Sequence, residues 1–214
     1  MTGGHLCITQ VHVERRNECA LYHRGQPPCQ AALRPMIVGE PWKRIGIDIT
    51  GSRPRSSNGY EYILTVMDHF SRWSEAYPLR DHGAPTVARL LIDQLFSRFG
   101  HPGQILSDQG KEFDGQLIHE LCKWMEIDKI RTSLYHSALN GMVERFHRTL
   151  NFMLAKFVTE NQRDWDTKVP LVMAAYRTFI HDTTGHTPNF FMSGREVRAP
   201  LDVVLGESKE EQRW

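Results

Sequence analysis

Alternation of apolar and polar residues predicts three β-strands after an irregular N-terminal stretch. The isoleucines of RIGIDIT, residues 44–50, alternate with small or polar residues, which is the two-residue period of a strand. Two further strands are expected at residues 60–68, after an Asn-Gly turn signal, and from Trp73 to Tyr77, where Pro78 ends the pattern. Three consecutive strands with short connections favour an antiparallel meander.

Helical spacing of apolar residues alternates with strand patterns in the middle of the chain. One helix is expected from Pro85 to Gly100, and a second over residues 114–125. Each is followed by a short strand, at residues 104–108 and 129–133. The apolar side of the second helix is predicted to consist of Leu117, Leu121 and Trp124.

A long helix is predicted to begin near the Asn-Gly turn signal at residues 140–141. Its polar residues Glu144, Arg148 and Asn151 share one face. Its apolar stripe is predicted to comprise Val143, Phe146, Leu150, Met153, Leu154 and Phe157.

A last helix starts at Asp164 and Trp165, is interrupted near Pro170 and runs on past Tyr176. The resulting order, βββ-α-β-α-β-α-α, predicts an α/β protein with a mixed sheet flanked by helices.

Composition leaves most function classes undecided. The chain has 214 residues, of which 40% are hydrophobic and 24% charged, as in a globular domain with a real core. No apolar run reaches the roughly 20 residues that span a bilayer, so we expect no membrane association. The start, MTGGHLCITQ, lacks the features of a secretory signal, and the four cysteines are expected to be reduced thiols inside the cell.

The net charge of +1 does not identify a nucleic-acid binder, but charge is unevenly distributed. From Lys129 to Arg148 there are four Lys or Arg residues and two histidines, against Glu144 as the only acid. Such a run is either a phosphate-facing stripe or a solvated helix face, and charge alone does not decide between them.

Three acids stand where strands and a helix can bring them together. Asp48 lies on the polar face of the first strand, Asp108 ends the fourth and Glu144 opens a helix, with 59 and 35 residues between them. If the two strands are neighbours, both aspartates reach one edge of the sheet. Clustered carboxylates repel one another unless cations hold them. Two Mg²⁺ ions prefer such oxygen ligands, and paired metals support in-line phosphoryl displacement.

Each acid also has an ordinary structural interpretation. Asp48 on a polar strand face can simply be solvated. Asp108, in SDQG, has turn residues around it, and Glu144 can complement the positive end of a helix dipole. The residues alone leave both interpretations standing.

Several sequence blocks, in order, carry a family resemblance. They read RIGIDITG, YILTVMDHFSRWSEAYPL, FGHPGQILSDQGKEF, NGMVERFHRTL, NQRDWD and AAYRTFIHDTTGHTPNFFMSGRE. Over about residues 33–206 the chain resembles the integrase catalytic core of gypsy-type LTR retrotransposons, kin to retroviral integrases. The three acids, the 35-residue gap and the flanking blocks occur together, so the resemblance does not depend on a single motif.

The resemblance implies a ribonuclease H-like fold with a mixed five-stranded sheet. It also implies polynucleotidyl transfer, in which DNA 3′-end processing is followed by strand transfer. Asp48, Asp108 and Glu144 match the catalytic, metal-binding acids of the family, with two Mg²⁺ or Mn²⁺ ions as cofactors. The implied partner is DNA, both element ends and target, bound by a homodimer or larger assembly in the nucleus.

Four residues are the nucleic-acid contacts that the resemblance implies. Asn140 and Gly141 match the flexible catalytic loop, and Arg148 matches a basic position that approaches DNA ends. His147 stands where the family commonly has asparagine.

Two regions depart from the family. The loop that usually reads YHPQSNG is YHSALNG here, and Ser137, Ala138 and Leu139 in place of Pro-Gln-Ser predict a slacker loop. Ahead of the core the family carries a His-His-Cys-Cys zinc module. Cys19 aligns with its last cysteine, but Arg16 takes the place of the preceding one, so we expect no zinc.

The expected domains are a degenerate remnant of the zinc module at residues 1–37, the catalytic core at 38–206 and a charged tail at 207–214. The chain stops at Trp214, so we expect no further C-terminal domain. The main alternative to an enzyme is a domesticated or fossil core that acts only as a DNA-binding or interaction module. A nuclease of the ribonuclease H group is a third reading, which the blocks after Glu144 disfavour.

Aromatic residues and histidines outside these motifs are given structural roles. The tryptophans interpreted as packing aromatics, rather than as base-stacking platforms, are Trp42, Trp73, Trp124 and Trp165. The histidines expected in loops or at the surface are His69, His82 and His101.

Overall fold

The structure is a computed structural model that describes residues 39–108, 110–131, 137–158 and 162–197, with the side chains of 137–140 excepted. Our expectations about zinc, about a remnant at 1–37 and about a tail at 207–214 concern residues outside the described ones. The side chain of Asn140 also lies outside them.

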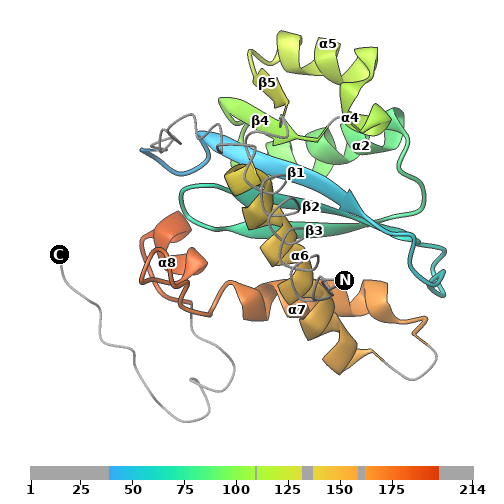
Figure 1. Ribbon diagram of the computed structural model, residues 1–214, viewed down its shortest axis with the longest axis vertical. Coiled ribbons are helices and arrows are strands. Elements are labelled where there is room, and N and C mark those ends of the chain that lie inside the picture. Colours follow the sequence, from blue (N-terminus) through green and yellow to red (C-terminus); the bar gives the residue numbers. More distant parts are fainter. Residues whose placement is uncertain (1–38, 109, 132–136, 159–161, 198–214) are drawn as a thin grey trace, which may run out of the picture. The chain divides into compact units, whose positions relative to one another are not determined.

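A five-stranded mixed sheet lies at the centre of the domain (Figure 1). Its strands are β1 (Arg44–Thr50), β2 (Tyr62–Asp68), β3 (Ser74–Leu79), β4 (Gln104–Ser107) and β5 (Asp128–Arg131), in the spatial order β3-β2-β1-β4-β5. The first three strands form the expected antiparallel meander, whereas β4 runs parallel to β1 and β5 parallel to β4. The mixed five-stranded sheet is therefore confirmed.

The end of β3 differs from the expectation. Pro78 does not end the strand, because β3 continues to Leu79 and Pro78 pairs with Ile63 of β2. β3 is an edge strand of the sheet. Proline is tolerated at an edge because its missing N–H can face away from the ladder.

Helices cover both faces of the sheet (Figure 1). One face carries a continuous helix made of α2 (Ala84–Leu90), the π-type segment η1 (Leu91–Phe96) and α3 (Ser97–Phe99), together with α4 (Lys111–Asp114) and α5 (Gln116–Trp124). The other face carries α6 (Ser137–Phe157) and α7 (Trp165–Tyr176), and the short helix α8 (Pro188–Ser193) follows.

Each face of the sheet buries its own hydrophobic core. Ile45 and Ile47 of β1 pack into the core beneath α2, η1 and α5. Gly46 and Asp48, which alternate with them, face α6. The core on that second face is formed by residues such as Phe146, Leu150, Trp165, Val169 and Met173. The predicted alternation in β1 is therefore confirmed.

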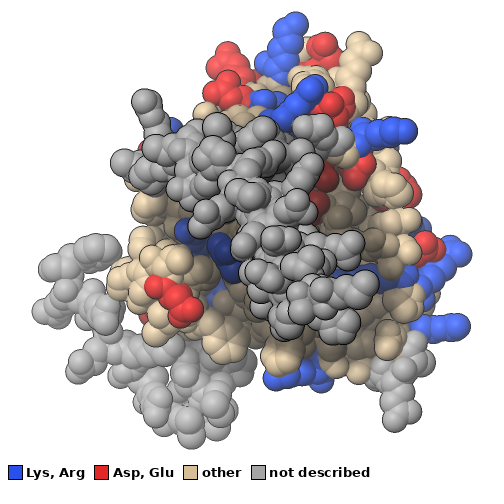
Figure 2. Space-filling model, viewed as in Figure 1, with Lys and Arg blue, Asp and Glu red and all other residues tan. Residues whose placement is uncertain are grey.

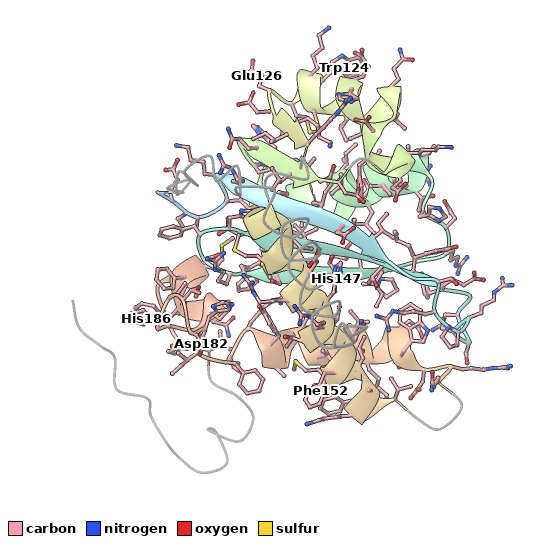
Figure 3. All side chains as sticks on the ribbon, in the orientation of Figure 1. Trp124, Glu126, His147, Phe152, Asp182 and His186 are labelled. Carbon is pink, nitrogen blue, oxygen red and sulfur yellow. The ribbon has the colours of Figure 1, made fainter. Side chains whose placement is uncertain are left out.

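The buried side of α5 was predicted only in part: Leu121 packs against the core, but Leu117 and Trp124 do not. Ile118 and Cys122 are the buried residues, whereas Leu117 is 46% exposed and Trp124 is 83% exposed. Figure 3 shows Trp124 on α5, at the end of the domain farthest from α7. The helix carries two apolar stripes, so its periodicity alone does not tell which stripe meets the sheet.

Two smaller assignments of burial are also corrected. His69 lies in the turn after β2, as a loop histidine would, but it is 5% exposed and packs beside Gly46, so it is not at the surface. Burial lowers its pKa to about 4, with Arg72 and Arg44 adding to the effect. Phe157 is 46% exposed, because the C-terminal end of α6 extends past the core that Leu150 and Leu154 enter.

The boundaries of α6 and α7 also differ from the expectation. The backbone of residues 137–140 is helical, so α6 begins one turn before the Asn-Gly pair, and the residues expected to form a slack loop belong to the helix. Ala138 and Leu139 are strong helix formers, which favours this extension. α7 runs without interruption through Pro170. Buried Val169 and Val172 flank the proline, and their packing outweighs the local cost of about 3 kcal/mol.

We predict that Gly46→Ala lowers the free energy of unfolding by about 1–3 kcal/mol, measured by urea denaturation. A Cβ at Gly46 would lie 2.9 Å from His69 Nε2 and 3.0 Å from Val143 Cγ2, so β1 and α6 must separate. Gly39→Ala is the control, since nothing lies within 4 Å of its Cβ position, and it should change stability by less than about 0.5 kcal/mol. Equal stabilities of the two variants would contradict the close packing of α6 on β1.

Candidate functional site

Asp48 lies near the end of β1, with its side chain toward α6. Its Oδ1 accepts a hydrogen bond from the N–H of Ile49 at 2.8 Å. Its Oδ2 lies 3.4 Å from His147 Nδ1, and the Asp48 side chain is 31% exposed. The carboxylate is therefore hydrogen-bonded at Oδ1 and has the His147 ring beside Oδ2, while one part of it still faces solvent.

His147 connects Asp48 to the neighbouring strand β2. Its Nε2 lies 2.6 Å from Thr65 Oγ1, and the Thr65 hydroxyl donates to the backbone oxygen of Asp48 at 3.0 Å. Burial, with a further contribution from the charge of Arg53, lowers the pKa of His147 to about 4. The ring is therefore uncharged near neutral pH, and its contact with Asp48 is not a pair of opposite charges. His147 lies on α6 over the middle of the sheet in Figure 3.

Asp108 stands at the same edge of the sheet as Asp48. β1 and β4 are parallel neighbours, with Gly46 paired to Leu106. Asp48 comes two residues after Gly46, and Asp108 comes two residues after Leu106. The predicted adjacency of the two strands is confirmed. Asp108 Oδ1 also accepts a hydrogen bond from the N–H of Gly110 at 3.0 Å, which is the turn interaction that the alternative interpretation expects.

Glu144 lies on α6, and its charge acts on Asp48 more weakly than that of Asp108 or Glu112. It is exposed, and because α6 begins at Ser137, the first turn of this helix contains no acid. The interpretation of Glu144 as a partner of the helix dipole therefore does not hold. Arg148 is exposed one turn further along, and Gly141 is half-buried one turn before.

The pKa of Asp48 reports how these carboxylates act on one another. It is raised to about 6, first by burial, then by the negative charges of Asp108, Glu112 and Glu144, while the Ile49 hydrogen bond opposes the shift. The three acids predicted from the sequence therefore interact in the folded protein, and Glu112 of α4 is a fourth. Sequence reasoning missed Glu112, although it follows Asp108 by only four residues.

The donor set fits a hard divalent cation. All four side chains offer carboxylate oxygens, and the repulsion that raises the pKa of Asp48 is what such a cation relieves. Within the part of the chain that the structure describes, no three His, Cys, Asp or Glu side chains already stand close enough to hold one ion.

Charge around the site is mixed. On the face shown in Figure 2, acidic and basic side chains are interspersed around α4 and α5 and do not form one basic area. Lys129 of β5 donates to Oγ of Ser107, the last residue of β4, at 2.5 Å, a contact that no sequence pattern indicated. No described helix is long and apolar enough to cross a membrane.

A β3-β2-β1-β4-β5 sheet covered by helices on both faces is the ribonuclease H-like fold of solved integrase catalytic cores. Residues 40–137 match the family described as integrase core domain. The chain belongs to this family.

Similar proteins come from retroelements and from an animal gene. Over 170 residues, which are 78% of its length, the chain is 28% identical to the retrovirus-related Pol polyprotein from transposon 412 of Drosophila melanogaster. It is 29% identical over 188 residues, 84% of this chain, to the Gypsy retrotransposon integrase-like protein 1 of Bos taurus. The matched region spans 14% of the first relative and 37% of the second.

A solved structure has the same fold. The HTLV-2 integrase catalytic core domain in complex with magnesium, in its trimeric form, superposes with a TM-score of 0.57 at 19% identity. The likeness covers 71% of this chain and 97% of that one.

We predict that Asp48→Asn stabilises the metal-free protein at pH 7.5 by about 1–3 kcal/mol, measured by urea denaturation. The folded-state pKa of Asp48, about 6, lies above the ordinary value of 3.8, so the folded protein loses stability as pH rises through this window. The asparagine variant should not lose this stability as pH rises, because its side chain does not ionise. Asp128→Asn, at an exposed position on β5, is the control and should change stability little at any pH. If the stability of wild type and of Asp48→Asn depended on pH in the same way, the raised pKa of Asp48 would be contradicted.

Proposed function

We propose that this chain is the core of a metal-dependent polynucleotidyl transferase that carries out DNA 3′-end processing and strand transfer. The observation that carries the proposal is the parallel pairing of β1 and β4, which puts Asp48 and Asp108 at one edge of the sheet. Burial raises the pKa of Asp48, and the charges of Asp108 and, more weakly, Glu144 add to this effect. Membership of the integrase core domain family supports the same chemistry. If these acids had only a structural role, their mutual repulsion would lower the stability of the fold and no other interaction would compensate for it.

Asp48, Asp108 and Glu144 are the proposed ligands of two Mg²⁺ or Mn²⁺ ions. The magnesium complex of the HTLV-2 core supports a divalent metal. When bound, such ions activate an attacking oxygen and stabilise the leaving one. Glu112 lies close enough to influence Asp48 and therefore to tune the charge of the site.

The protein's own groups prepare Asp48 for this role. The Ile49 N–H fixes Oδ1, and the Thr65 hydroxyl fixes the backbone of Asp48 from β2. His147 closes the remaining side against Oδ2. We therefore propose His147 first as a positioning residue for Asp48, with nucleic-acid contact limited to the exposed edge of its ring.

Arg148, Asn140 and Gly141 remain the proposed contacts to DNA. Arg148 is exposed on the turn of α6 that follows Glu144, where a guanidinium can bind the phosphate next to the reacting one. Such contacts bind by counterion release and weaken as salt rises. The proposed partners are element ends and target DNA in the nucleus. A homodimer or larger assembly is the proposed functional form, supported by the trimeric form of the HTLV-2 core.

A second candidate function is a core that binds DNA or another protein without catalysis. Two observations favour it. The described side chains contain no ready three-ligand set, and the YHSALNG segment differs from the family pattern. Catalysis on a suitable DNA separates the two candidates.

We predict metal-dependent activity on a pre-assembled branched DNA, whose reacting groups are already in place, and little activity on linear ends. Asp108→Asn and Glu144→Gln should each lower the rate by about 100-fold or more while the melting temperature stays the same or rises. Glu120→Gln, at an exposed position on α5, is the matched control and should keep the wild-type rate. Undiminished activity in either acid variant would reject the assignment. A wild-type chain that binds DNA but never reacts would favour the second candidate.

We predict that Arg148→Gln weakens DNA binding about three- to tenfold at low salt and lowers the slope of log affinity against log salt by about 1. The reason is the loss of one phosphate contact. Arg89→Gln, at an exposed position on α2 on the opposite side of the sheet, should leave both quantities unchanged. Fluorescence anisotropy at several salt concentrations measures both. Equal slopes for all three proteins would place the DNA elsewhere.

A further inference from the structure

Glu112 stands beside Asp108, although the two residues belong to different parts of the turn that follows β4. Glu112 lies in α4, which begins directly after Gly110. A Cβ built at Gly110 would lie 2.7 Å from Glu112 Oε1 and 3.0 Å from Asp108 Oδ1. Both carboxylate oxygens therefore border one small space, which stays clear only because residue 110 is a glycine.

The local backbone places the two carboxylates in this way. Helical side chains lean toward the N-terminus of their helix, so the side chain of Glu112 is directed back toward Gly110. Phe113, the next residue, is fully buried and fixes α4 against the core on its face of the sheet. The N–H of Gly110 donates to Asp108 Oδ1 at 3.0 Å, which ties Asp108 to the same turn. One turn of backbone thus carries both acids.

An acid in the first turn of a helix can also be a partner of the helix dipole. α4 has only four residues, so the dipole that it offers is small. Asp114, in the same helix, has an ordinary structural contact, because it pairs with Arg131 at 2.8 Å. The half-buried Glu112, by contrast, makes no hydrogen bond or ion pair with any described residue. A structural role therefore accounts for Asp114 better than for Glu112.

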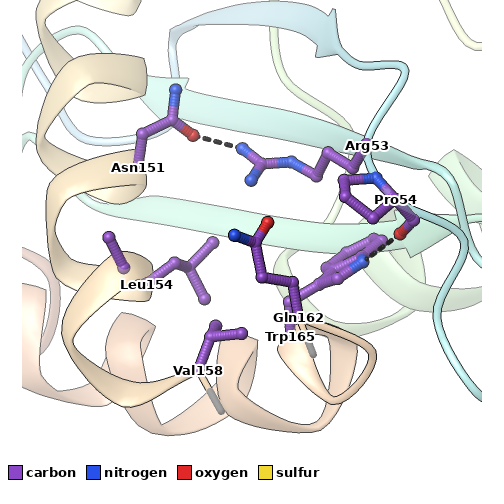
Figure 4. A pocket seen from close by; sticks show the side chains of 8 residues that line it. Arg53, Pro54, Asn151, Leu154, Val158, Gln162 and Trp165 are labelled. Atoms are coloured by element: carbon purple, nitrogen blue, oxygen red, sulfur yellow. Dashed lines mark hydrogen bonds between the residues drawn. The ribbon is translucent and has the colours of Figure 1, made fainter. Parts of the chain in front are cut away.

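Basic side chains in this part of the domain are held by other partners. The charge of Arg53 reaches His147, but its guanidinium borders a cavity of about 330 Å³ between the segment after β1 and the facing parts of α6 and α7 (Figure 4). There Arg53 donates to Asn151 Oδ1 and lies over the Trp165 ring. Lys129 donates to the hydroxyl oxygen at the end of β4. Within the described residues, neither cation lies within 4.0 Å of a carboxylate of the site.

The negative charge of Glu112 acts on Asp48 as well. Burial is the main cause of the raised pKa of Asp48, the charge of Asp108 adds to it, and the charge of Glu112 contributes more than that of Glu144. Carboxylates that repel one another without a cationic partner become favourable once a cation binds among them. Their oxygen atoms are the ligands that Mg²⁺ and Mn²⁺ prefer.

We propose that Glu112 joins Asp48 and Asp108 in binding a divalent cation in the DNA-free protein, and that it contributes more to this binding than Glu144 does. The inference deepens the function proposed above and rests on it for the identity of the cation as Mg²⁺ or Mn²⁺. Because no three described His, Cys, Asp or Glu side chains already stand close enough to hold one ion, binding involves a change of rotamer at Glu112.

The first test measures the affinity of the full, DNA-free chain for Mn²⁺ by isothermal titration calorimetry. Wild type should bind Mn²⁺, and Glu112→Gln should weaken binding by about tenfold. Glu144→Gln should weaken it less than Glu112→Gln does. Glu120→Gln, at an exposed position on α5, is the matched control and should bind as wild type does.

Three results of this titration overturn the proposal. They are a wild-type chain that binds no Mn²⁺, a Glu112→Gln variant with the affinity of wild type, and a larger loss of affinity in Glu144→Gln than in Glu112→Gln.

The second test moves the Glu112 carboxylate without removing its charge. Gly110 has φ −57° and ψ 140°, which alanine adopts without strain, so Gly110→Ala should fold as wild type does. Its methyl group takes the space that both oxygens border, and Mn²⁺ affinity should fall about as far as in Glu112→Gln. The double variant Gly110→Ala/Glu112→Gln should then lose little more. An equal loss from Gly110→Ala in both backgrounds would show that the methyl group acts through Asp108, which would overturn the role of Glu112.

The third test follows the melting temperature with and without Mg²⁺. Glu112→Gln removes a repelling charge, so the metal-free variant should melt at the wild-type temperature or above it. Its melting temperature should rise less than that of wild type when Mg²⁺ is added, because a weaker ligand stabilises less. A lower melting temperature of Glu112→Gln both with and without Mg²⁺ would make Glu112 a structural acid and reject the proposal.

Strand transfer on branched DNA, measured at rising Mg²⁺ concentration, distinguishes this inference from the proposed function. The rate of Glu112→Gln should fall at low Mg²⁺ and approach the wild-type rate at high Mg²⁺, whereas Asp108→Asn should not recover. A wild type that never reacts, together with the expected loss of Mn²⁺ affinity in Glu112→Gln, supports the role of Glu112 and rejects the enzyme. Wild-type affinity and wild-type rates in Glu112→Gln at every Mg²⁺ concentration overturn the role of Glu112 and leave the proposed function standing.

Discussion

The close contact between β1 and α6 sets the geometry on which the candidate site depends. Gly46 presents no side chain at this point, so Val143 Cγ2 stands 3.0 Å from where a Cβ would be. Because a helix is a rigid rod, the residues that follow Val143 are carried to fixed positions over β1. Glu144 and His147 therefore reach Asp48, which lies two residues beyond Gly46 on the same strand. A larger residue at Gly46 would move every one of these groups together.

The acids that this packing gathers act against the stability of the fold. Burial and three neighbouring carboxylates hold the pKa of Asp48 near 6, so near neutral pH the site carries unrelieved negative charge. Among the described residues, no cationic side chain lies within 4.0 Å of these acids except His147 beside Asp48, and the low pKa of His147 leaves its ring uncharged near neutral pH. Of the two cations on β5, Arg131 is engaged with Asp114 at 2.8 Å and Lys129 donates to Ser107 Oγ at 2.5 Å. The hydrophobic cores on both faces of the sheet absorb this cost, as is typical of sites shaped by function.

Sequence patterns predicted the fold wherever a single physical signal was present. The alternation in residues 44–50 has one apolar face, so it determined the orientation of Asp48. α5 has two apolar stripes, and only packing against the sheet selected Ile118 over Trp124. Pro170 is tolerated because neighbouring residues are buried, a tertiary effect that no local pattern contains. The Arg53 cavity could not be predicted at all, since its walls come from segments about 100 residues apart.

One face of α6 joins the acids to the Arg53 cavity, and charge changes sign along it. Glu144 stands at the acidic end, Arg148 follows one turn later, and Asn151 then meets the guanidinium of Arg53. A polyanion is repelled at the first point unless divalent ions are present and is attracted at the others. The sign of the charge on this face of α6 therefore changes within about two turns, and the acidic part of the face is the part that the proposed divalent ions would neutralise.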